Sequence, residues 1–149
     1  MKVLLKYILA ILIVVAALFA CATGKVAHTP EESEIFNTQS SDSVAISNDS
    51  LEYEIIIIEP GFNIWLNSVA KPEGYYSQHF LENRNRIYVI NWNQRVQQPF
   101  RYSPDLYTMQ IDYDPFIDYG YEVNYKLYNY FIYFQRKYNQ RLAGFVPRI

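Results

Sequence analysis

The pattern of hydrophobic and polar positions divides the 149-residue chain into three parts. Residues 7–20 are an unbroken apolar run, and residues 22–50 are rich in Ser, Thr, Asn, Asp and Glu. Residues 51–149 place apolar side chains at the spacings of helices and strands. We therefore expect an α+β fold, a small single domain in which a short sheet of two or a few strands packs on two longer helices. A signal peptide and a disordered tether are expected to precede this domain.

Two segments of the third part have the patterns of β-strands. Residues 53–59 contain four consecutive isoleucines, whose β-branched side chains favour extended backbone. Residues 106–113 alternate between apolar and polar side chains, as in a half-buried strand. Because a lone strand leaves its backbone hydrogen bonds unmade, we expect these two segments to pair.

Two further segments have apolar residues at helical spacing. Residues 62–69 form one short apolar face, bounded by Pro60-Gly61 in front. Ser77 is a suitable N-cap for a second helix that runs to about residue 97. Within it, residues 86–92 fit a strand equally well, so the sequence leaves helix and strand open there.

The longest predicted helix begins at Asp114-Pro115, because Asp suits the N-cap and Pro the first turn. Glu122 and Lys126 are spaced for a favourable i,i+4 ion pair. Its apolar stripe consists of Val123, Leu127, Phe131, Phe134 and Tyr138.

Four carboxylates lie close together around this predicted helix start: Asp112, Asp114, Asp118 and Glu122. Asp112-x-Asp114 begins like a calcium loop, but Phe116 and Ile117 stand where a third oxygen ligand and a glycine are required. We therefore expect no metal site and no other cofactor. Asp114 is expected to cap the helix, with Asp118 and Glu122 complementing its dipole.

The first 21 residues have the layout of a bacterial export signal, with lysines before an apolar run. The run ends in LFAC at residues 18–21, which resembles the lipobox of bacterial lipoproteins, whose cysteine is lipidated and begins the mature chain. We expect a signal peptide over residues 1–20 and lipidation of Cys21. Two alternatives stay open: ordinary cleavage after Ala22, and an uncleaved helix, although a span needs about 20 apolar residues. Cys21 is the only cysteine, so an internal disulfide is excluded.

Residues 22–50 carry five acidic side chains and one lysine, with few apolar residues. Such a composition does not offset the entropy of ordering, so we expect residues 21–50 to be a disordered, Ser/Thr-rich acidic tether. The alternative is that its larger apolar residues dock on the domain or on a partner: Ile35, Phe36, Val44 and Ile46. The globular domain is then expected over residues 51–142, with a tail over residues 143–149. Residues 51–149 carry ten basic and ten acidic groups, so no nucleic-acid partner is expected.

Tyrosine is unusually frequent near the C-terminus, with ten of the 15 tyrosines in residues 102–138. One group on the last helix lies away from its apolar stripe and is a candidate surface for a protein partner or a glycan: Tyr121, Tyr125, Tyr128, Asn124 and Asn129. Exposed tyrosines offer a large contact area with a polar end. The alternative is that these rings pack inside the domain with their hydroxyls at its edge.

No sequence motif for catalysis is recognised. The chain lacks a nucleophile elbow, a P-loop, a metal-binding His pair and a Gly-rich cofactor loop. We expect a non-catalytic binding or structural module that uses the tyrosine-rich surface for a protein partner. The alternative is a glycan-binding or glycan-cleaving module, with Asp112, Asp114 or Glu122 as carboxylates.

Several segments resemble a family of small Bacteroidota lipoproteins of unknown function. They are YEIIII at 53–58, YYSQ at 75–78, Trp92-Asn93, IDYDP at 111–115 and YGYEVNYKLYNY at 119–130. The similarity covers about residues 51–142, with the lipobox in front. It implies a lipid-anchored protein of a Gram-negative cell envelope, with the outer membrane as the expected location, and it adds no catalytic residue. No acidic run follows Cys21, so the membrane leaflet stays open.

Overall fold

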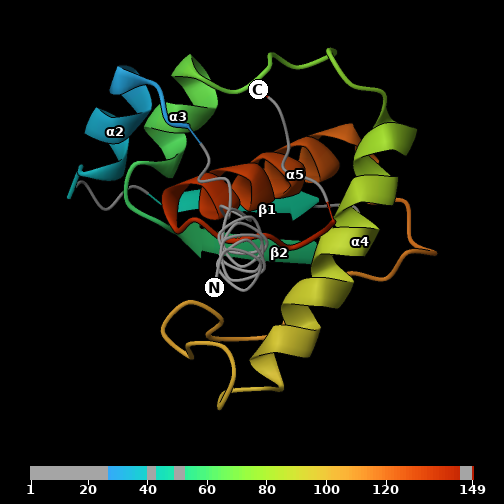
Figure 1. The fold of residues 1–149 in the computed structure, drawn as a ribbon. Helices are drawn as coiled ribbons and strands as arrows, with labels where there is room; N and C mark the ends of the chain where they lie inside the picture. The colour runs from blue at the N-terminus through green and yellow to red at the C-terminus, as the bar shows by residue number, and fades with distance from the viewer. Residues whose placement is uncertain (1–26, 40–42, 49–52, 145–148) are drawn as a thin grey trace, which may run out of the picture.

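The computed structural model describes residues 27–39, 43–48, 53–144 and 149. The expected α+β class is confirmed, and in this part of the chain a two-stranded antiparallel sheet accompanies four helices, two of them long (Figure 1). The predicted signal peptide and Cys21 lie outside the described residues. In chain order the elements are α2 (Pro30–Phe36), β1 (Ser43–Asn48), β2 (Tyr53–Ile58), α3 (Phe62–Ser68), α4 (Gln78–Val96) and α5 (Gly120–Lys137).

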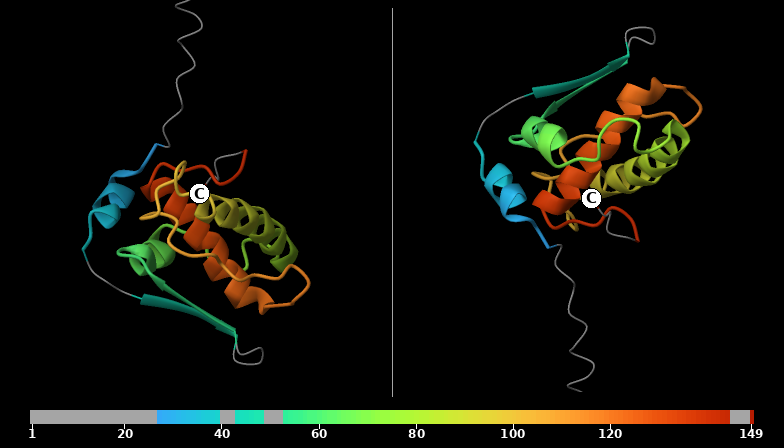
Figure 2. Two further views of the ribbon diagram at one scale, coloured as in Figure 1. Left: turned by 90° about the horizontal axis from the view of Figure 1, so that it is seen from below. Right: turned by 90° about the horizontal axis from the view of Figure 1, so that it is seen from above.

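Helix α5 is the central element of the fold. The two views of Figure 2 show the β1–β2 pair on one side of α5 and α4 on the other. Helix α3 also packs on α5, and α2 packs on α3. Twelve of the 18 residues of α5 are buried. A helix covered from several directions must be largely apolar around its circumference, and aromatic rings supply most of that surface here.

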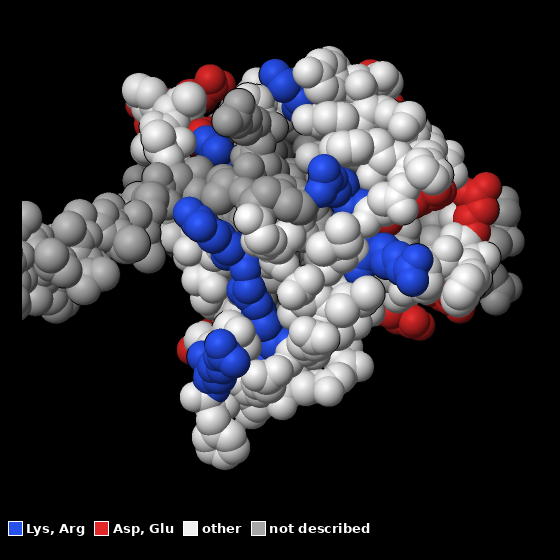
Figure 3. All heavy atoms as spheres, turned by 45° about the vertical axis from the view of Figure 1, so that its right-hand side comes forward, with Lys and Arg blue, Asp and Glu red and all other residues white. Residues whose placement is uncertain are grey.

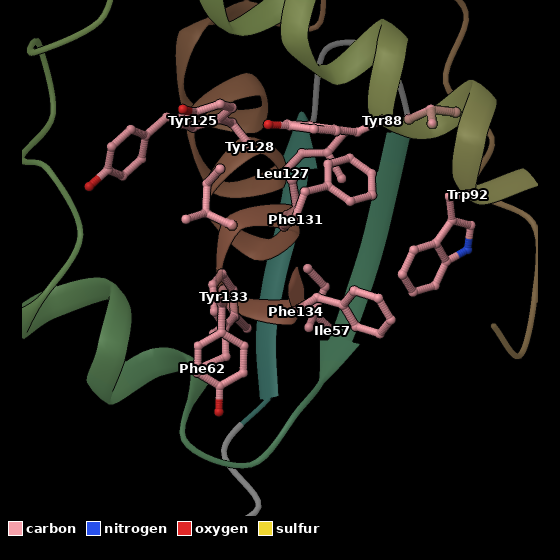
Figure 4. Close-up of a cluster of buried hydrophobic side chains, with 14 of the residues drawn as sticks. Ile57, Phe62, Tyr88, Trp92, Tyr125, Leu127, Tyr128, Phe131, Tyr133 and Phe134 are labelled. Atoms are coloured by element: carbon pink, nitrogen blue, oxygen red, sulfur yellow. The ribbon is translucent and has the colours of Figure 1, made fainter. Parts of the chain in front are cut away.

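The core is a cluster of aromatic rings between α4 and α5 (Figure 4). Trp92 meets Phe134 with a centroid distance of 4.7 Å, and Tyr88 meets Phe131 at 5.4 Å. Both pairs are tilted rather than face to face, as aromatic quadrupoles prefer. Each ring of this kind removes a large apolar area from water, so a short chain obtains a substantial core from few residues.

Strand β2 is confirmed, but its predicted partner is wrong. The strand paired with it is β1, antiparallel, with Val44 opposite Ile57 and Ile46 opposite Ile55. Val44, Ile46 and Ile57 are buried against the helices. The pairing is local in sequence, which lowers the entropy of loop closure compared with a partner about 50 residues away.

Residues 106–113 form an extended loop instead of a strand. Their backbone is hydrogen-bonded to side chains of α4: Trp92 Nε1 donates to the Met109 carbonyl at 2.9 Å, and Asn93 Nδ2 donates to the Ile111 carbonyl at 2.9 Å. The Ile111 amide in turn donates to Asn93 Oδ1 at 2.8 Å. The backbone groups that a sheet would satisfy are therefore satisfied by a helix, which explains why the alternating pattern does not give a strand.

The prediction of a disordered tether is wrong for residues 27–39 and 43–48, which form α2 and β1 with their adjoining turns. The alternative of docking is found instead. Ile35, Val44 and Ile46 are buried, and Phe36 packs on the core. The remaining tether positions lie outside the described residues.

Helix α2 is stabilised at its first turn by a capping box. The Thr29 hydroxyl accepts the Glu32 amide at 3.2 Å, and the Thr29 amide donates to Glu32 Oε2 at 3.1 Å. Glu32 also forms a fully buried ion pair with Arg136 of α5. Trp65 Nε1 of α3 donates to Glu32 Oε1 at 3.1 Å. One carboxylate therefore links the N-terminal segment to two other helices.

The predicted N-cap is confirmed for α4 and wrong for α5. Ser77 caps α4 as predicted, since its hydroxyl accepts the Phe80 amide at 3.3 Å, and residues 86–92 are helical. Asp114 does not cap α5, because the helix begins at Gly120. Gly120 has φ of +80°, a left-handed turn that separates Asp114-Pro115 from the helix and that glycine adopts without a Cβ penalty.

Substitution of Gly61, at the start of α3, tests how closely α2 packs against this position. Its φ is +84°, and an added Cβ would lie 2.6 Å from the Ile35 carbonyl oxygen and 2.9 Å from the Tyr133 hydroxyl. Gly61→Ala should therefore lower the free energy of unfolding by about 1–3 kcal/mol more than a change with left-handed strain alone. The matched control is Gly74→Ala, with φ of +82° and no atom within 4 Å of the added Cβ. Denaturant unfolding measures both variants, and equal losses would contradict the close packing of α2 on Gly61.

Candidate functional site

The candidate tyrosine surface on α5 is not exposed. Asn124, Asn129, Tyr125 and Tyr128 are buried, and Tyr121 is half-buried. The alternative, in which the rings pack inside, is found, and Figure 4 shows Tyr125 and Tyr128 projecting from α5. Both the protein-partner and the glycan interpretations depended on an exposed aromatic face here. The prediction that these residues are exposed is therefore wrong.

These tyrosines use their hydroxyls to hold the fold together. Tyr125 donates to the Lys71 carbonyl at 2.9 Å, and the Gly74 amide donates to the Tyr121 hydroxyl at 2.6 Å. Burial raises the pKa of Tyr88 to about 12 and that of Tyr113 to about 12. The hydroxyls of Tyr88 and Tyr113 therefore stay protonated at neutral pH and do not act as bases.

The two buried asparagines serve the same structural purpose. Asn124 Oδ1 accepts the Tyr113 hydroxyl at 2.7 Å and Asn85 Nδ2 at 3.1 Å. Asn129 Nδ2 donates to the Tyr125 carbonyl one turn earlier, at 2.9 Å. These side-chain hydrogen bonds of both asparagines are made within the domain, which is consistent with their burial.

The four carboxylates between residues 112 and 122 do not converge. Within the described ranges, no group of three or more His, Cys, Asp or Glu residues could hold a metal ion. Asp118 accepts the Gly120 amide at 2.9 Å, and Glu122 binds Lys126 at 2.6 Å, as its spacing predicts. Asp114 accepts the Phe116 amide at 2.8 Å. Each of these three carboxylates thus has a local structural partner at the turn before α5 or in its first turns.

A groove of about 680 Å³ runs along β2. Strand β2 with Glu59 forms one wall, and the extended loop forms the other with residues 105, 106 and 108–112. Three side chains from α4 and α5 form its floor: Trp92, Leu127 and Tyr130. Residues 53–59 and 106–113, which the sequence pattern pairs, therefore lie on opposite sides of a groove without forming a ladder.

The groove opens on the edge of β2 rather than on one of its faces. Successive side chains of a strand point to opposite faces, yet Tyr53, Glu54, Ile55, Ile57 and Ile58 all line the groove. Only the backbone edge brings both faces of a strand to one cavity. The opposite edge of β2 is occupied by β1.

One end of the groove is bridged by a side chain, and at the other end Glu59 is held by residues at the end of α5. At one end the Tyr53 hydroxyl donates to the Asp112 carbonyl at 2.7 Å. At the other, Lys137 binds Glu59 at 2.7 Å and the Tyr138 hydroxyl donates to the same carboxylate at 2.7 Å. The Tyr53 side chain therefore joins the loop to β2 at one end, while Trp92 and Asn93 bind the loop backbone to α4.

A family model matches residues 7–147 of the chain, which include all six described elements and the groove. The chain belongs to DUF6146, a family of unknown function. No curated protein and no solved structure matches it. The function of this DUF6146 domain must therefore be argued from its own site.

The groove of this DUF6146 domain is apolar at its floor and acidic at its rim. Its lining contains the carboxylates of Glu54, Glu59, Asp105 and Asp112, and no described Lys, Arg or His. Two apolar side chains also stand out at the lining: Ile58 is 71% exposed and Met109 is 70% exposed. Such a site suits a ligand that combines apolar groups with positive charge.

Sequence reasoning missed this site because it treated residues 53–59 and 106–113 as partners. The two segments face each other across the groove, but they do not pair as strands as predicted. What the pattern does not contain is the set of α4 side chains, above all Trp92 and Asn93, that bind the loop backbone in place of β2.

Proposed function

We propose that this DUF6146 member is an exported lipoprotein of the Bacteroidota cell envelope, held at the membrane by acyl chains on Cys21. Its domain is a non-catalytic module that binds a protein partner in the groove beside β2. The observation that carries the anchoring is the N-terminal sequence, in which a positive start and an apolar run lead into LFAC at residues 18–21. The family match begins at residue 7 and so includes the run and the cysteine.

A binding role is supported by the chemistry of the groove. Its floor offers apolar rings, and its wall offers a strand edge, both of which hold a chain without transforming it. The rim carboxylates add charge. The hydroxyls of the buried Tyr88 and Tyr128, whose pKa values are raised by burial, supply no base at neutral pH.

The packing of α2 supports a position close to the membrane. Arg136 Nη2 donates to the Ala27 carbonyl at 3.1 Å, so the chain contacts the domain six positions after Cys21. Six extended residues span at most about 20 Å. In the described part, none of the helices is both long and apolar enough to cross a bilayer. Several acyl chains on Cys21 would provide stable attachment, because a single chain gives only marginal binding.

Cys21→Ser tests the anchor. The wild-type chain should sediment with membranes and carry the mass of acyl groups on an N-terminal Cys21, whereas the variant should lose both properties because serine forms no thioether. Mass spectrometry of the N-terminus and membrane fractionation measure this. The matched control is Thr23→Ala, which should leave lipidation unchanged. A mature wild-type chain that begins unmodified at Thr23 would show ordinary cleavage and contradict the proposal.

A further inference from the structure

We propose that the groove beside β2 receives an extended, cationic segment of the partner as a third strand of the sheet. This inference rests on the part of the proposed function that assigns partner binding to the groove. It does not depend on lipidation of Cys21.

The edge of β2 that faces the groove has no backbone partner among the described residues. The two segments that face each other across the groove, Tyr53–Ile58 and residues 105–112, are both described, and no backbone hydrogen bond joins them. An unpaired edge presents a row of amide and carbonyl groups that pairs readily with an added strand. Addition of a peptide strand to such an edge is a recurring mode of recognition.

The length of the β2 edge sets the length of the partner segment. Strand β2 has six residues, and at about 3.3 Å per residue its edge is about 20 Å long. A partner segment of about six residues therefore matches it. The loop backbone is bound to α4 by Trp92 and Asn93, so the added strand displaces no backbone–backbone hydrogen bond along β2, and the bond from the Tyr53 hydroxyl to the Asp112 carbonyl crosses the groove at one end.

The groove has an apolar floor and an acidic rim, and this division sets the residue pattern of the partner segment. In an added strand, alternate side chains point in opposite directions. One set faces the apolar floor of Trp92, Leu127 and Tyr130, and the other faces solvent near the rim carboxylates. The matching segment therefore alternates between apolar and basic residues.

The negative charge of the groove favours a positively charged partner segment. Glu59 is paired with Lys137, but Glu54, Asp105 and Asp112 are exposed carboxylates at the groove. This acidity is not general to the molecule, because Figure 3 shows a face on which Lys and Arg side chains predominate. No described side chain of that type lines the groove. Complementary charge steers and orients a partner.

The test uses the full chain and synthetic eight-residue peptides of alternating valine and lysine, with valine–glutamate peptides as the control. Calorimetry should detect binding of the lysine peptide only, with affinity that falls as salt is added. Hydrogen exchange should show new protection of β2 amides upon binding. Peptides N-methylated at alternate positions sharpen the test, because only one of the two sets points its amides at the edge. One methylated set should abolish binding and the other should leave it nearly unchanged.

Asp105→Asn combined with Asp112→Asn should weaken binding of the lysine peptide by about tenfold, from the usual worth of exposed ion pairs. The matched control is Glu31→Gln with Glu34→Gln, which removes the same charge from exposed positions of α2. Melting temperatures should stay unchanged in both double variants. Equal weakening in the two would overturn the proposal, since binding would then reflect net charge alone.

Other outcomes separate this inference from the proposed function. A peptide that binds without protecting β2, or that tolerates both methylation sets equally, overturns strand addition but leaves groove binding standing. Absence of binding by every peptide overturns both. Sedimentation that shows a dimer through paired β2 edges overturns the inference in favour of a second copy of the chain.

Discussion

Glu32→Ala should lower the free energy of unfolding by about 3–5 kcal/mol, the usual cost of breaking a buried ion pair. The Glu32 side chain is fully buried and Arg136 is 6% exposed. Removing the carboxylate leaves the guanidinium buried without its counter-ion, with the Ala27 carbonyl as a remaining acceptor, and leaves the Trp65 Nε1 donor without its acceptor. Denaturant unfolding followed by circular dichroism measures the loss.

Two neighbouring glutamates provide matched controls. Glu31 and Glu34 lie on the same helix with exposed side chains, so Glu31→Ala and Glu34→Ala should each change stability by less than about 0.5 kcal/mol. A double change, Glu32→Leu with Arg136→Met, should recover much of the loss because neither charge remains buried. An effect of Glu32→Ala no larger than these controls would mean that residues 27–39 form a tether after all.

The same ion pair predicts a dependence on pH. Burial by itself raises the pKa of Glu32, but hydrogen bonds from Arg136, Thr29 and Trp65 and the charge of Arg136 outweigh it, so the pKa lies below its ordinary value near 4.5. A carboxyl with a lowered folded-state pKa stabilises the fold above its unfolded-state pKa, and this stabilisation is lost as the pH falls through the folded-state pKa. The stability difference between wild type and Glu32→Ala should therefore be full at neutral pH and shrink below about pH 4.5.

Phe131→Ala should cost about 3–5 kcal/mol, the range for removal of a buried ring. Phe131 has no exposed surface and packs on Tyr88 and Trp92, with centroid distances of 5.4 Å and 6.0 Å. Truncation leaves a cavity between α4 and α5 that these rigid rings fill poorly. Thermal unfolding should show a drop in melting temperature of at least 10 °C, at about 4–8 °C per kcal/mol.

Phe116→Ala is the control for this change. The same ring is removed, but Phe116 is 91% exposed in the turn before α5. Its replacement should alter stability by no more than about 0.5 kcal/mol. Similar losses for the two phenylalanines would contradict the placement of α5 at the centre of the core.

The elements with strong local signals were predictable from the sequence. The isoleucine run predicts β2, the i, i+3, i+4 spacing predicts α3, and the Ser77 cap predicts the start of α4. Helices α4 and α5 are confirmed over most of their lengths. In each case propensity and periodicity within one segment are sufficient.

Strand β1 and helix α2 were not predictable by composition, because their segment is acidic and polar on average. Their order depends on a few buried side chains, Ile35, Val44 and Ile46, and on an ion partner 104 residues away. The signals present were the Thr29–Glu32 capping box and the alternation of residues 43–46. The average composition of this segment led to the prediction of disorder. Its structure depends instead on a few specific contacts, which an average does not record.

The candidate site shows the same limit. Tyr125 and Tyr128 lie off the apolar stripe of α5, which suggests exposure on a helix with one buried face. Because α5 is covered from three directions, its other faces are buried too. How many neighbours surround a helix is a tertiary property, and the period of the sequence does not contain it.

The contact between Glu32 and Arg136 also sets an order of events when the protein is made. Glu32 and Arg136 are 104 residues apart, so the stretch between them must be synthesised before α2 acquires its ionic partner. Contacts between such distant positions form slowly, because a long loop must close before they add stability. A nascent chain therefore lacks the ionic contact of its first segment with the central helix until α5 has been synthesised.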